Sequence, residues 1–326
     1  MYGIRSNDTR KAIQYAAGLI TAQDTSVKEV SIKDREKNED EIVYYVASVI
    51  VLLNTQINKQ RFYLSHDNEV ISVAVSTVEG QFMASSELAA APCIHVWSRK
   101  TLETLAVLKG EHARGVHLLS FTHDNNYLVT CGIQSPSAVI VFDWRLQQVV
   151  ESFKIDQFTQ AIVIMPEITY NKIENEHGIE VDRNVHGVAI LSLKEIWFLT
   201  PKKTGSEHQG SASYFEKSKL IIEGAEISSD SLEPMCGIMV RADQHNRYFG
   251  ELAIHDHEQR HIFLTGHQDG GVYAWRQESY IGKMTQFETP VISMCYCSIG
   301  IAIATWEGLV QIWDGLLNSP RFTLNL

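Results

Sequence analysis

A short strand-like run that ends in a tryptophan or another large apolar residue recurs along this chain of 326 residues. The equivalent positions, in chain order, are Trp97, Phe142, Leu199, Trp275 and Trp313. Their separations are 45, 57, 76 and 38 residues. Two of these lie near the ~40–45 residues of a four-stranded propeller blade, and the other two fit that length plus an insertion. The repeat constrains the fold strongly, because each unit needs its neighbours to bury its apolar face.

The residues upstream of each repeat position divide into three short β-rich runs. VISVAVS, FMASS and CIHVW follow His66 in this way, and PVISMCY, IAIATW and LVQIWD form a similar series near the C-terminus. Gly270 and Gly308 lie where a tight hairpin would join the second and third strands, and glycine readily adopts the positive φ of such turns. These patterns predict an all-β, WD-repeat-like β-propeller of about six blades, six or seven and not necessarily a complete ring, with four antiparallel strands in each blade.

Histidines precede the first strand in two of the expected blades. His66 and His112 occupy this loop, whereas Ile155-Asp156 and Glu288-Thr289 take the corresponding place in later blades. A tryptophan that ends the third strand can bury its ring between blades while its indole N–H finds a polar partner. We therefore expect His66 and His112 to be structural, and the polar network to be degenerate, because the later blades lack a histidine at this place.

Residues 1–65 differ from the blade pattern and lead into it. They hold Tyr2-Gly3, Arg5 and Asp8-Thr9-Arg10, followed by the block YYVASVIVLLN and the run QRFYL. These residues resemble the hydrophobic motif that opens the echinoderm microtubule-associated protein-like family, and the resemblance continues through IHVW, VFDWR and FLTGHQDGGVYAW. We therefore expect an N-terminal hydrophobic motif over residues 1–65 that contributes one blade, followed by WD-type blades over residues 66–326.

The resemblance implies a function as well as a fold. It implies a tandem propeller without catalytic activity, acting as a scaffold that associates with tubulin, microtubules or axonemal proteins. It also implies a cytoplasmic, cytoskeletal location, with the cilium axoneme as a candidate. The alternative is a general WD-repeat adaptor of a multiprotein complex unrelated to microtubules.

Two stretches exceed the blade length, at residues 167–185 and 201–234. The second contains the Gly/Ser-rich TGSEHQGSAS, the acidic EGAEISSDSLEP and, between them, YFEKSKLII, which predicts an outer strand. Long insertions on a scaffold are either flexible surface or carriers of partner contacts. We expect other proteins to bind through these loops, and deletion of residues 201–234 to abolish localisation without unfolding the chain.

One segment, HDHEQRH, combines residue types that bind metals. It holds His255, His257 and Glu258, with His261 four residues after His257, and on a helix this histidine pair could bind zinc. The segment precedes a predicted strand, which favours an exposed polar turn, so we expect no metal site. The sequence contains no nucleophile elbow, Walker loop or dinucleotide fingerprint, so we expect no enzyme activity and no cofactor.

Charge, cysteine spacing and hydropathy limit the classes of partner and the cellular compartment that are expected for the chain. The formal net charge of -11 opposes general binding to nucleic acid phosphates. Five cysteines without regular spacing favour a reducing compartment, and Cys295 and Cys297, on one face of a strand, are expected in the core. The most apolar run, Ile42 to Leu53, has 12 residues, short of the ~20 that span a bilayer. We expect no membrane partner, and the sequence does not identify the partner-binding residues.

Overall fold

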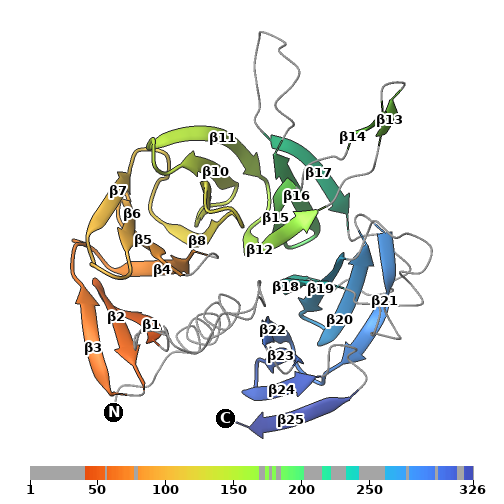
Figure 1. The fold of residues 1–326 in the computed structure, drawn as a ribbon. Helices are drawn as coiled ribbons and strands as arrows, with labels where there is room; N and C mark the ends of the chain where they lie inside the picture. The colour runs from red at the N-terminus through yellow and green to blue at the C-terminus, as the bar shows by residue number, and fades with distance from the viewer. Residues whose placement is uncertain are drawn as a thin grey trace. The chain divides into compact units, whose positions relative to one another are not determined.

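A computed structural model shows how the strands of the repeat are arranged (Figure 1). The residues that it describes are 41–55, 57–76, 80–168, 173–175, 178–180, 185–201, 215–221, 233–241, 261–276, 279–297, 300–313 and 319–325. The regular elements of these residues are β-strands, in agreement with the all-β prediction. The chain divides into two compact units, one formed mainly by the residues before 157 and the other mainly by the residues from 157 on.

The first unit contains three antiparallel sheets, each a propeller blade whose strands follow one another in chain order. The first blade has three strands among the described residues, and the second and third have four. The strands are β1 (Glu41–Val46), β2 (Val49–Asn54), β3 (Lys59–Tyr63), β4 (Val70–Val75), β5 (Phe82–Glu87), β6 (Ile94–Ser98), β7 (Thr104–Leu108), β8 (Val116–Phe121), β9 (Tyr127–Gly132), β10 (Ser137–Asp143) and β11 (Gln148–Ile155).

The second unit contains three four-stranded blades and a short separate hairpin. The fourth blade has the order β12-β15-β16-β17, because the hairpin β13-β14 is inserted after its first strand. The strands are β12 (Thr159–Ile168), β13 (Ile173–Asn175), β14 (Gly178–Glu180), β15 (Val185–Ser192), β16 (Glu195–Pro201), β17 (Phe215–Ile221), β18 (Pro234–Arg241), β19 (His261–His267), β20 (Gly271–Arg276), β21 (Ser279–Gln286), β22 (Val291–Cys297), β23 (Gly300–Thr305), β24 (Leu309–Trp313) and β25 (Pro320–Asn325).

Apolar side chains from neighbouring blades form shared cores within each unit. In the first unit, Tyr63 of the first blade packs with Trp97 of the second, and Ala84 of the second packs with Leu128 of the third. In the second unit, one core joins the fourth and fifth blades and another joins the fifth and sixth. A blade with neighbours on both faces loses the polar side that a single sheet keeps, which is why β5 is buried from Met83 to Glu87.

The strand register confirms the alignment of the five repeat positions. Each lies on the third strand of a four-stranded blade and pairs with a residue of the second strand. The pairs are Trp97 with Met83, Phe142 with Leu128, Leu199 with Val188, Trp275 with Phe263, and Trp313 with Ile301.

The glycine turns also agree with the sequence. Gly270 has φ +82° between β19 and β20, and Gly308 has φ +86° between β23 and β24. A Cβ atom at Gly270 would lie 2.3 Å from the Phe287 carbonyl oxygen, so glycine is required there for space as well as for conformation. Cys295 is buried in β22 as predicted, while the side chain of Cys297 lies outside the described residues.

One expectation about the insertions is wrong. Residues 201–234 include β17, which is the outer strand of the fourth blade and pairs along its length with β16. Phe215 of β17 is buried, so deleting the whole stretch would remove part of the blade as well as the loops. The prediction that YFEKSKLII forms an outer strand is confirmed, and a loop deletion has to spare residues 215–221.

Candidate protein-interaction surface

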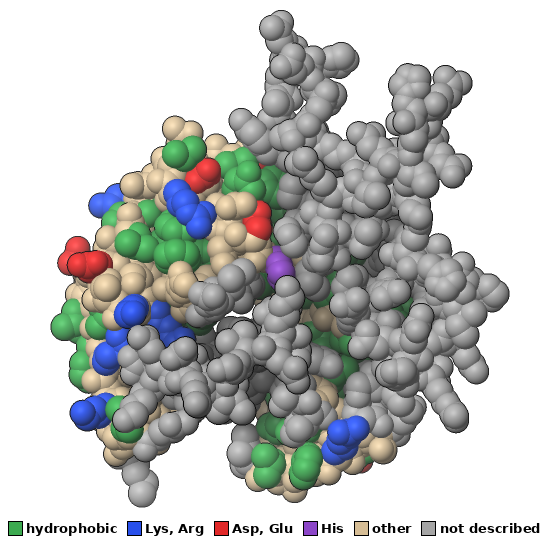
Figure 2. Space-filling view, viewed as in Figure 1, with side chains coloured by type: hydrophobic (Ala, Val, Ile, Leu, Met, Phe, Trp, Pro, Cys, Tyr) green, Lys and Arg blue, Asp and Glu red, His purple; other side chains and the backbone are tan. Residues whose placement is uncertain are grey.

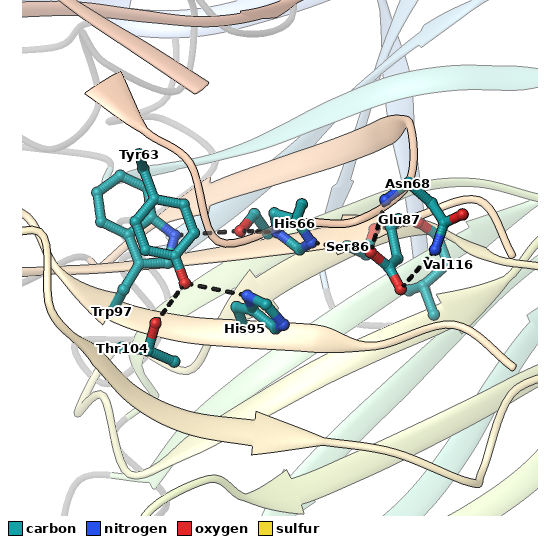
Figure 3. A network of polar contacts seen from close by, with 10 residues as sticks. Tyr63, His66, Asn68, Ser86, Glu87, His95, Trp97, Thr104 and Val116 are labelled. Carbon is teal, nitrogen blue, oxygen red and sulfur yellow. Dashed lines mark hydrogen bonds and ion pairs between the residues drawn. The ribbon is translucent and has the colours of Figure 1, made fainter. Parts of the chain in front are cut away.

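A buried polar network crosses the second blade and holds its tryptophan (Figure 3). Trp97 on β6 donates its indole N–H to Ser85 Oγ on β5 at 3.1 Å. Ser85 Oγ also lies 2.7 Å from His66 Nε2, and His66 Nδ1 lies 3.3 Å from Glu87 Oε2. Because an ionised carboxylate only accepts hydrogen bonds, neutral His66 donates from Nδ1 and accepts from Ser85 at Nε2. The network therefore runs in one direction, from the indole to the carboxylate.

Aromatic rings extend the network into the first blade. Tyr63 of β3 stacks on Trp97 with ring centroids 4.3 Å apart. The Tyr63 hydroxyl lies 3.0 Å from His95 Nδ1 and 2.7 Å from Thr104 Oγ1. The His66 and His95 rings stack at 4.1 Å. Both polar and ring contacts thus join the first two blades (Figure 3).

The protonation of this network follows from its burial. Burial lowers the pKa of His66, although the hydrogen bond and charge of Glu87 act in the opposite direction. Burial, and then the charge of His66, lower the pKa of His95 to about 4. Burial alone would raise the pKa of Glu87, but hydrogen bonds from His66 and Asn68 outweigh it and hold that pKa below its usual value. At neutral pH both histidines are therefore neutral and Glu87 is ionised.

Ser85, His66 and Glu87 have the order of hydroxyl, imidazole and carboxylate that serine hydrolases use. This order produces a nucleophile only where a substrate can reach the hydroxyl. Ser85 is 0% exposed, His66 is 4% exposed, and Ser85 Oγ already accepts the Trp97 indole hydrogen bond. The three residues act as internal hydrogen-bond partners, and the prediction that His66 is structural is confirmed.

His112 has a similar buried position in the third blade. Its Nε2 lies 2.7 Å from Thr130 Oγ1, and that hydroxyl donates to the Ile140 carbonyl at 3.0 Å. The hydroxyl hydrogen is therefore used, and His112 donates to it from Nε2. Burial, followed by the charge of His117, lowers the pKa of His112 to about 4. The structural role predicted for His112 is confirmed.

The network of the third blade is shorter than that of the second. Phe142 takes the position of Trp97 and cannot donate a hydrogen bond to the central hydroxyl. Gly132 takes the position of Glu87, two residues after the hydroxyl residue on the second strand. In consequence, His112 Nδ1 has no hydrogen-bond partner among the described residues.

The fifth blade contains a network that the sequence analysis did not expect. Trp275 on β20 donates to Thr265 Oγ1 at 2.7 Å, and His267 Nε2 lies 2.7 Å from the same hydroxyl. Thr265 and His267 are both fully buried. This histidine was not foreseen because it lies on β19 itself, at the position of Glu87, and not in the loop before the first strand.

The structure describes only the last residue of the histidine-rich segment HDHEQRH. His255, His257 and Glu258 lie outside the described residues, and His261 is described only as the first residue of β19. Among the residues that the structure describes, no group of three His, Cys, Asp or Glu could hold a metal ion. The same part of the chain contains no helix long and apolar enough to cross a membrane. That this segment binds no metal stays a prediction.

Basic side chains surround Glu41 at one end of the first two blades. Arg61 on β3 donates from Nε to Glu41 Oε1 at 3.0 Å and from Nη2 to Glu41 Oε2 at 2.9 Å. Arg99, in the turn after β6, donates from Nε to Glu41 Oε2 at 3.1 Å. Arg61 Nη1 also donates to the Lys100 carbonyl at 3.0 Å. We refer to Glu41, Lys59, Arg61, Arg99 and Lys100 as the Glu41 cluster.

The register of the first blade explains why these charges meet. Glu41, Asn54 and Lys59 form one row across β1, β2 and β3, and Arg61 follows on the same face of β3. The Glu41 side chain is 3% exposed, whereas the side chains of Arg61 and Arg99 are 30% and 19% exposed. A buried carboxylate needs such partners. Figure 2 shows Lys and Arg side chains gathered at the lower left of the view, over the place of the first strands in Figure 1.

Sequence reasoning missed the Glu41 cluster, although a signal was present. Residues 41–108 contain only four Lys and Arg residues, and all four belong to the cluster. They occur as two short runs, Lys59 with Arg61 and Arg99 with Lys100. An uneven distribution of this kind in an acidic chain indicates a local basic surface.

Six blades, two of which contain a buried hydrogen bond from a tryptophan indole to a hydroxyl, define the chain as a WD-repeat β-propeller. A solved structure supports this class: the β-propeller domain of Cps50 (Swd1) from Myceliophteria thermophila has a TM-score of 0.51 and 11% identity, covering 79% of this chain and 72% of that one. At this identity the likeness shows the fold alone. The predicted all-β propeller of six antiparallel, mostly four-stranded blades is confirmed.

Comparison by sequence finds partial relatives. No protein-family profile matches the chain. The chain is 30% identical over 125 residues to the 77 kDa echinoderm microtubule-associated protein of Lytechinus variegatus, covering 36% of this chain and 19% of that protein. The protein of the same name from Strongylocentrotus purpuratus is 31% identical over 125 residues, and human echinoderm microtubule-associated protein-like 1 is 29% identical over 120 residues. The match spans less than a fifth of the length of these relatives.

Proposed function

We propose that this chain is a non-catalytic protein-interaction scaffold that associates with microtubules, by docking on the tubulin lattice or on axonemal partners. The observation that carries the proposal is its 30% identity over 125 residues to a protein named for microtubule association. The propeller supports the scaffold role, because its blades bury their polar networks and leave rims and loops for partners. The Ser85–His66–Glu87 array supports the absence of catalysis through its burial.

Different parts of the chain supply different parts of this function. Residues 1–65 supply the N-terminal hydrophobic motif and one blade, and residues 66–326 supply the WD-type blades. The loops within 167–185 and 201–234 carry contacts to further proteins. The chain acts in the cytoplasm on the cytoskeleton, with the cilium axoneme as one place of action.

Co-sedimentation with purified microtubules tests the proposal. The chain should pellet with microtubules in a saturable way, and should stay in the supernatant when microtubules are omitted. Because the chain is acidic, with net charge -11, binding should depend on local contacts and weaken as salt screens them. The chain should also fractionate with axonemes.

Failure to pellet with microtubules at any salt, together with absence from axonemes, would overturn the microtubule part. The chain would then be a general WD-repeat adaptor of another multiprotein complex. That alternative fits the short extent of the match, which covers 36% of this chain.

A further inference from the structure

We infer that the chain self-associates by packing the first blade of one copy on the sixth blade of a second copy. The inference goes beyond the proposed function and does not depend on it. The first blade shares an apolar core with the second blade, and the sixth shares one with the fifth. In each case one face of the blade takes part in the core. The opposite faces of the first and sixth blades, which we call the terminal faces, carry the inference.

The terminal face of the first blade is apolar and exposed. Val43 and Tyr63 lie in the core shared with the second blade, so the residues that alternate with them face away from it. The register of β1, β2 and β3 gives the members of this face, which are Ile42, Tyr44, Val46, Val49, Val51, Leu53, Gln60 and Phe62. Ile42, Val46 and Phe62 are 46%, 62% and 46% exposed. None of the members is charged.

The repeat indicates what this face should contact. Leu53 pairs with Ile42 on the neighbouring strand, as Trp97 pairs with Met83 in the second blade. Leu53 and Trp97 also each pair with a residue seven places further along the chain, on the outer strand. In the second blade, Met83 and Trp97 pack on the first blade. The terminal face of the first blade is therefore the one on which a preceding blade would pack, and no blade precedes it among the described residues.

The terminal face of the sixth blade is also apolar and exposed. Ile303 lies in the core shared with the fifth blade, so its neighbours on β23 face away from that core. The register of β23, β24 and β25 gives the members of this face, which are Ala302, Ala304, Val310, Ile312, Phe322 and Leu324. Phe322 and Leu324 are 57% and 58% exposed. Figure 2 shows hydrophobic side chains at the lower edge of the view, over the place of β25 in Figure 1.

The two terminal faces are the two halves of the contact that this repeat makes. Ala302 pairs with Ile312 as Ala84 pairs with Val96 in the second blade, where Ala84 and Val96 pack on the third blade. Within each unit, a face of the sixth-blade type thus packs on a face of the first-blade type in the next blade. A terminal repeat that stays alone has a polar outer face, which neither of these blades has. A second copy supplies the missing neighbour and continues the same packing.

The area and charge of the terminal faces fit a weak, reversible association. Half-exposed side chains of this size leave roughly 80–100 Å² each in contact with water, and the two faces together roughly 800 Å². This is the small end of specific interfaces, which bury about 1,000 Å² or more. Because neither face is charged, the contact involves no ion pairs, while the net charge of -11 makes the copies repel. Association should therefore strengthen as salt screens this repulsion.

Sedimentation velocity of the full chain over a range of concentrations tests the inference. The native chain should associate more as its concentration rises. The variants Val46→Glu/Phe62→Glu and Phe322→Glu/Leu324→Glu each place two carboxylates on one terminal face, and each alone should associate at least about tenfold more weakly. An equimolar mixture of the two variants should form 1:1 dimers, because each variant contributes the face that the other lacks.

The control Leu105→Glu/Leu146→Glu makes the same change of charge at exposed apolar positions of the second and third blades. It should associate within about twofold of the native chain. Thermal unfolding checks that each variant is folded, and glutamine replaces glutamate in a variant that is not.

The outcomes separate a second copy from the other occupants of these faces. Association of the mixture, with both face variants inactive alone, supports the inference. A native chain that stays monomeric at all concentrations and salt levels overturns it, as does a mixture of folded variants that fails to associate. Equal loss in the control overturns it too, because charge alone would then explain the effect. If Phe322→Glu/Leu324→Glu still associates alone, the first blade pairs with itself and the inferred contact is wrong.

Discussion

The second and third blades have the same strand pattern but differ at two positions around the central hydroxyl. In the second blade, the hydroxyl receives the indole of Trp97, and the histidine is completed by Glu87. In the third, Phe142 and Gly132 occupy these positions, so the hydroxyl has no indole donor and the histidine lacks its carboxylate. The hydroxyl bound to a buried imidazole is common to both blades. The groups at either end of the network vary.

The fifth blade shows that the source of the imidazole varies too. His267 reaches the hydroxyl of Thr265 from the position that Glu87 holds in the second blade. The third blade has another tryptophan, Trp144, which donates its indole N–H to the Asn125 carbonyl at 2.9 Å. A degenerate repeat can therefore keep its packing while it exchanges the partners of one buried hydroxyl.

The substitution with the largest expected effect on stability removes the tryptophan of the second-blade network. Trp97→Ala should lower the free energy of unfolding by about 3–5 kcal/mol, because it creates a cavity between two blades and removes one of the two hydrogen-bond partners of the Ser85 hydroxyl. The measurement is urea unfolding followed by circular dichroism. Trp306→Ala is the control, since Trp306 is 47% exposed and its loss should change stability by about 0.5 kcal/mol or less. Equal losses in the two variants would mean that Trp97 contributes no more to stability than an exposed tryptophan does.

A finer test compares the same substitution in two blades. Thr265→Val leaves the Trp275 indole N–H and His267 Nε2 without their hydroxyl partner, at about 1–3 kcal/mol for each orphaned group. Thr130→Val takes a partner from His112 Nε2, while the Ile140 carbonyl stays in a strand with neighbours on both sides. Thr265→Val should therefore be the more destabilising by urea unfolding. The reverse order would show that the indole bond contributes little.

Much of this fold could be predicted because its signal is local. The repeat positions, from Trp97 to Trp313, lie on the third strands as their spacing indicated, and the turn glycines have positive φ. The sequence did not predict the role of His267 for a physical reason: the other histidines lie in the loop before the first strand, whereas any position that brings an imidazole nitrogen to the hydroxyl is sufficient. In a strand, the residue two places on from the hydroxyl residue meets this condition.

Sequence spacing could not predict that the residues of the Glu41 cluster lie together. Lys59 and Arg61 belong to β3, and Arg99 and Lys100 to the turn after β6. Nothing between these runs indicates that they meet, because their approach depends on how two blades pack. The buried Glu41 that joins them begins a strand otherwise rich in apolar and aromatic residues, where a sequence pattern gives it no distinct role.

A further expected effect appears only in acid. The pKa values of His95 and His112 are lowered to about 4, whereas histidine in an unfolded chain titrates near ~6.5. Between these values the unfolded chain binds protons that the folded chain does not, so the free energy of unfolding falls as pH falls. Each such group contributes a slope of up to ~1.4 kcal/mol per pH unit in this window. Above about pH 6.5 neither state is protonated there, and these groups leave stability unchanged.

The variant His112→Gln distinguishes the contribution of the third blade to this loss of stability in acid from the contribution of the second blade. Glutamine can still donate a side-chain N–H to Thr130 but does not titrate, so the slope between about pH 6.5 and 4 should become shallower by up to ~1.4 kcal/mol per pH unit. Urea midpoints measured across this range give the slope for each protein. If the slope is unchanged, the acid sensitivity belongs to the stacked His66 and His95. The lack of a carboxylate at Gly132 would then have no consequence for the titration of His112.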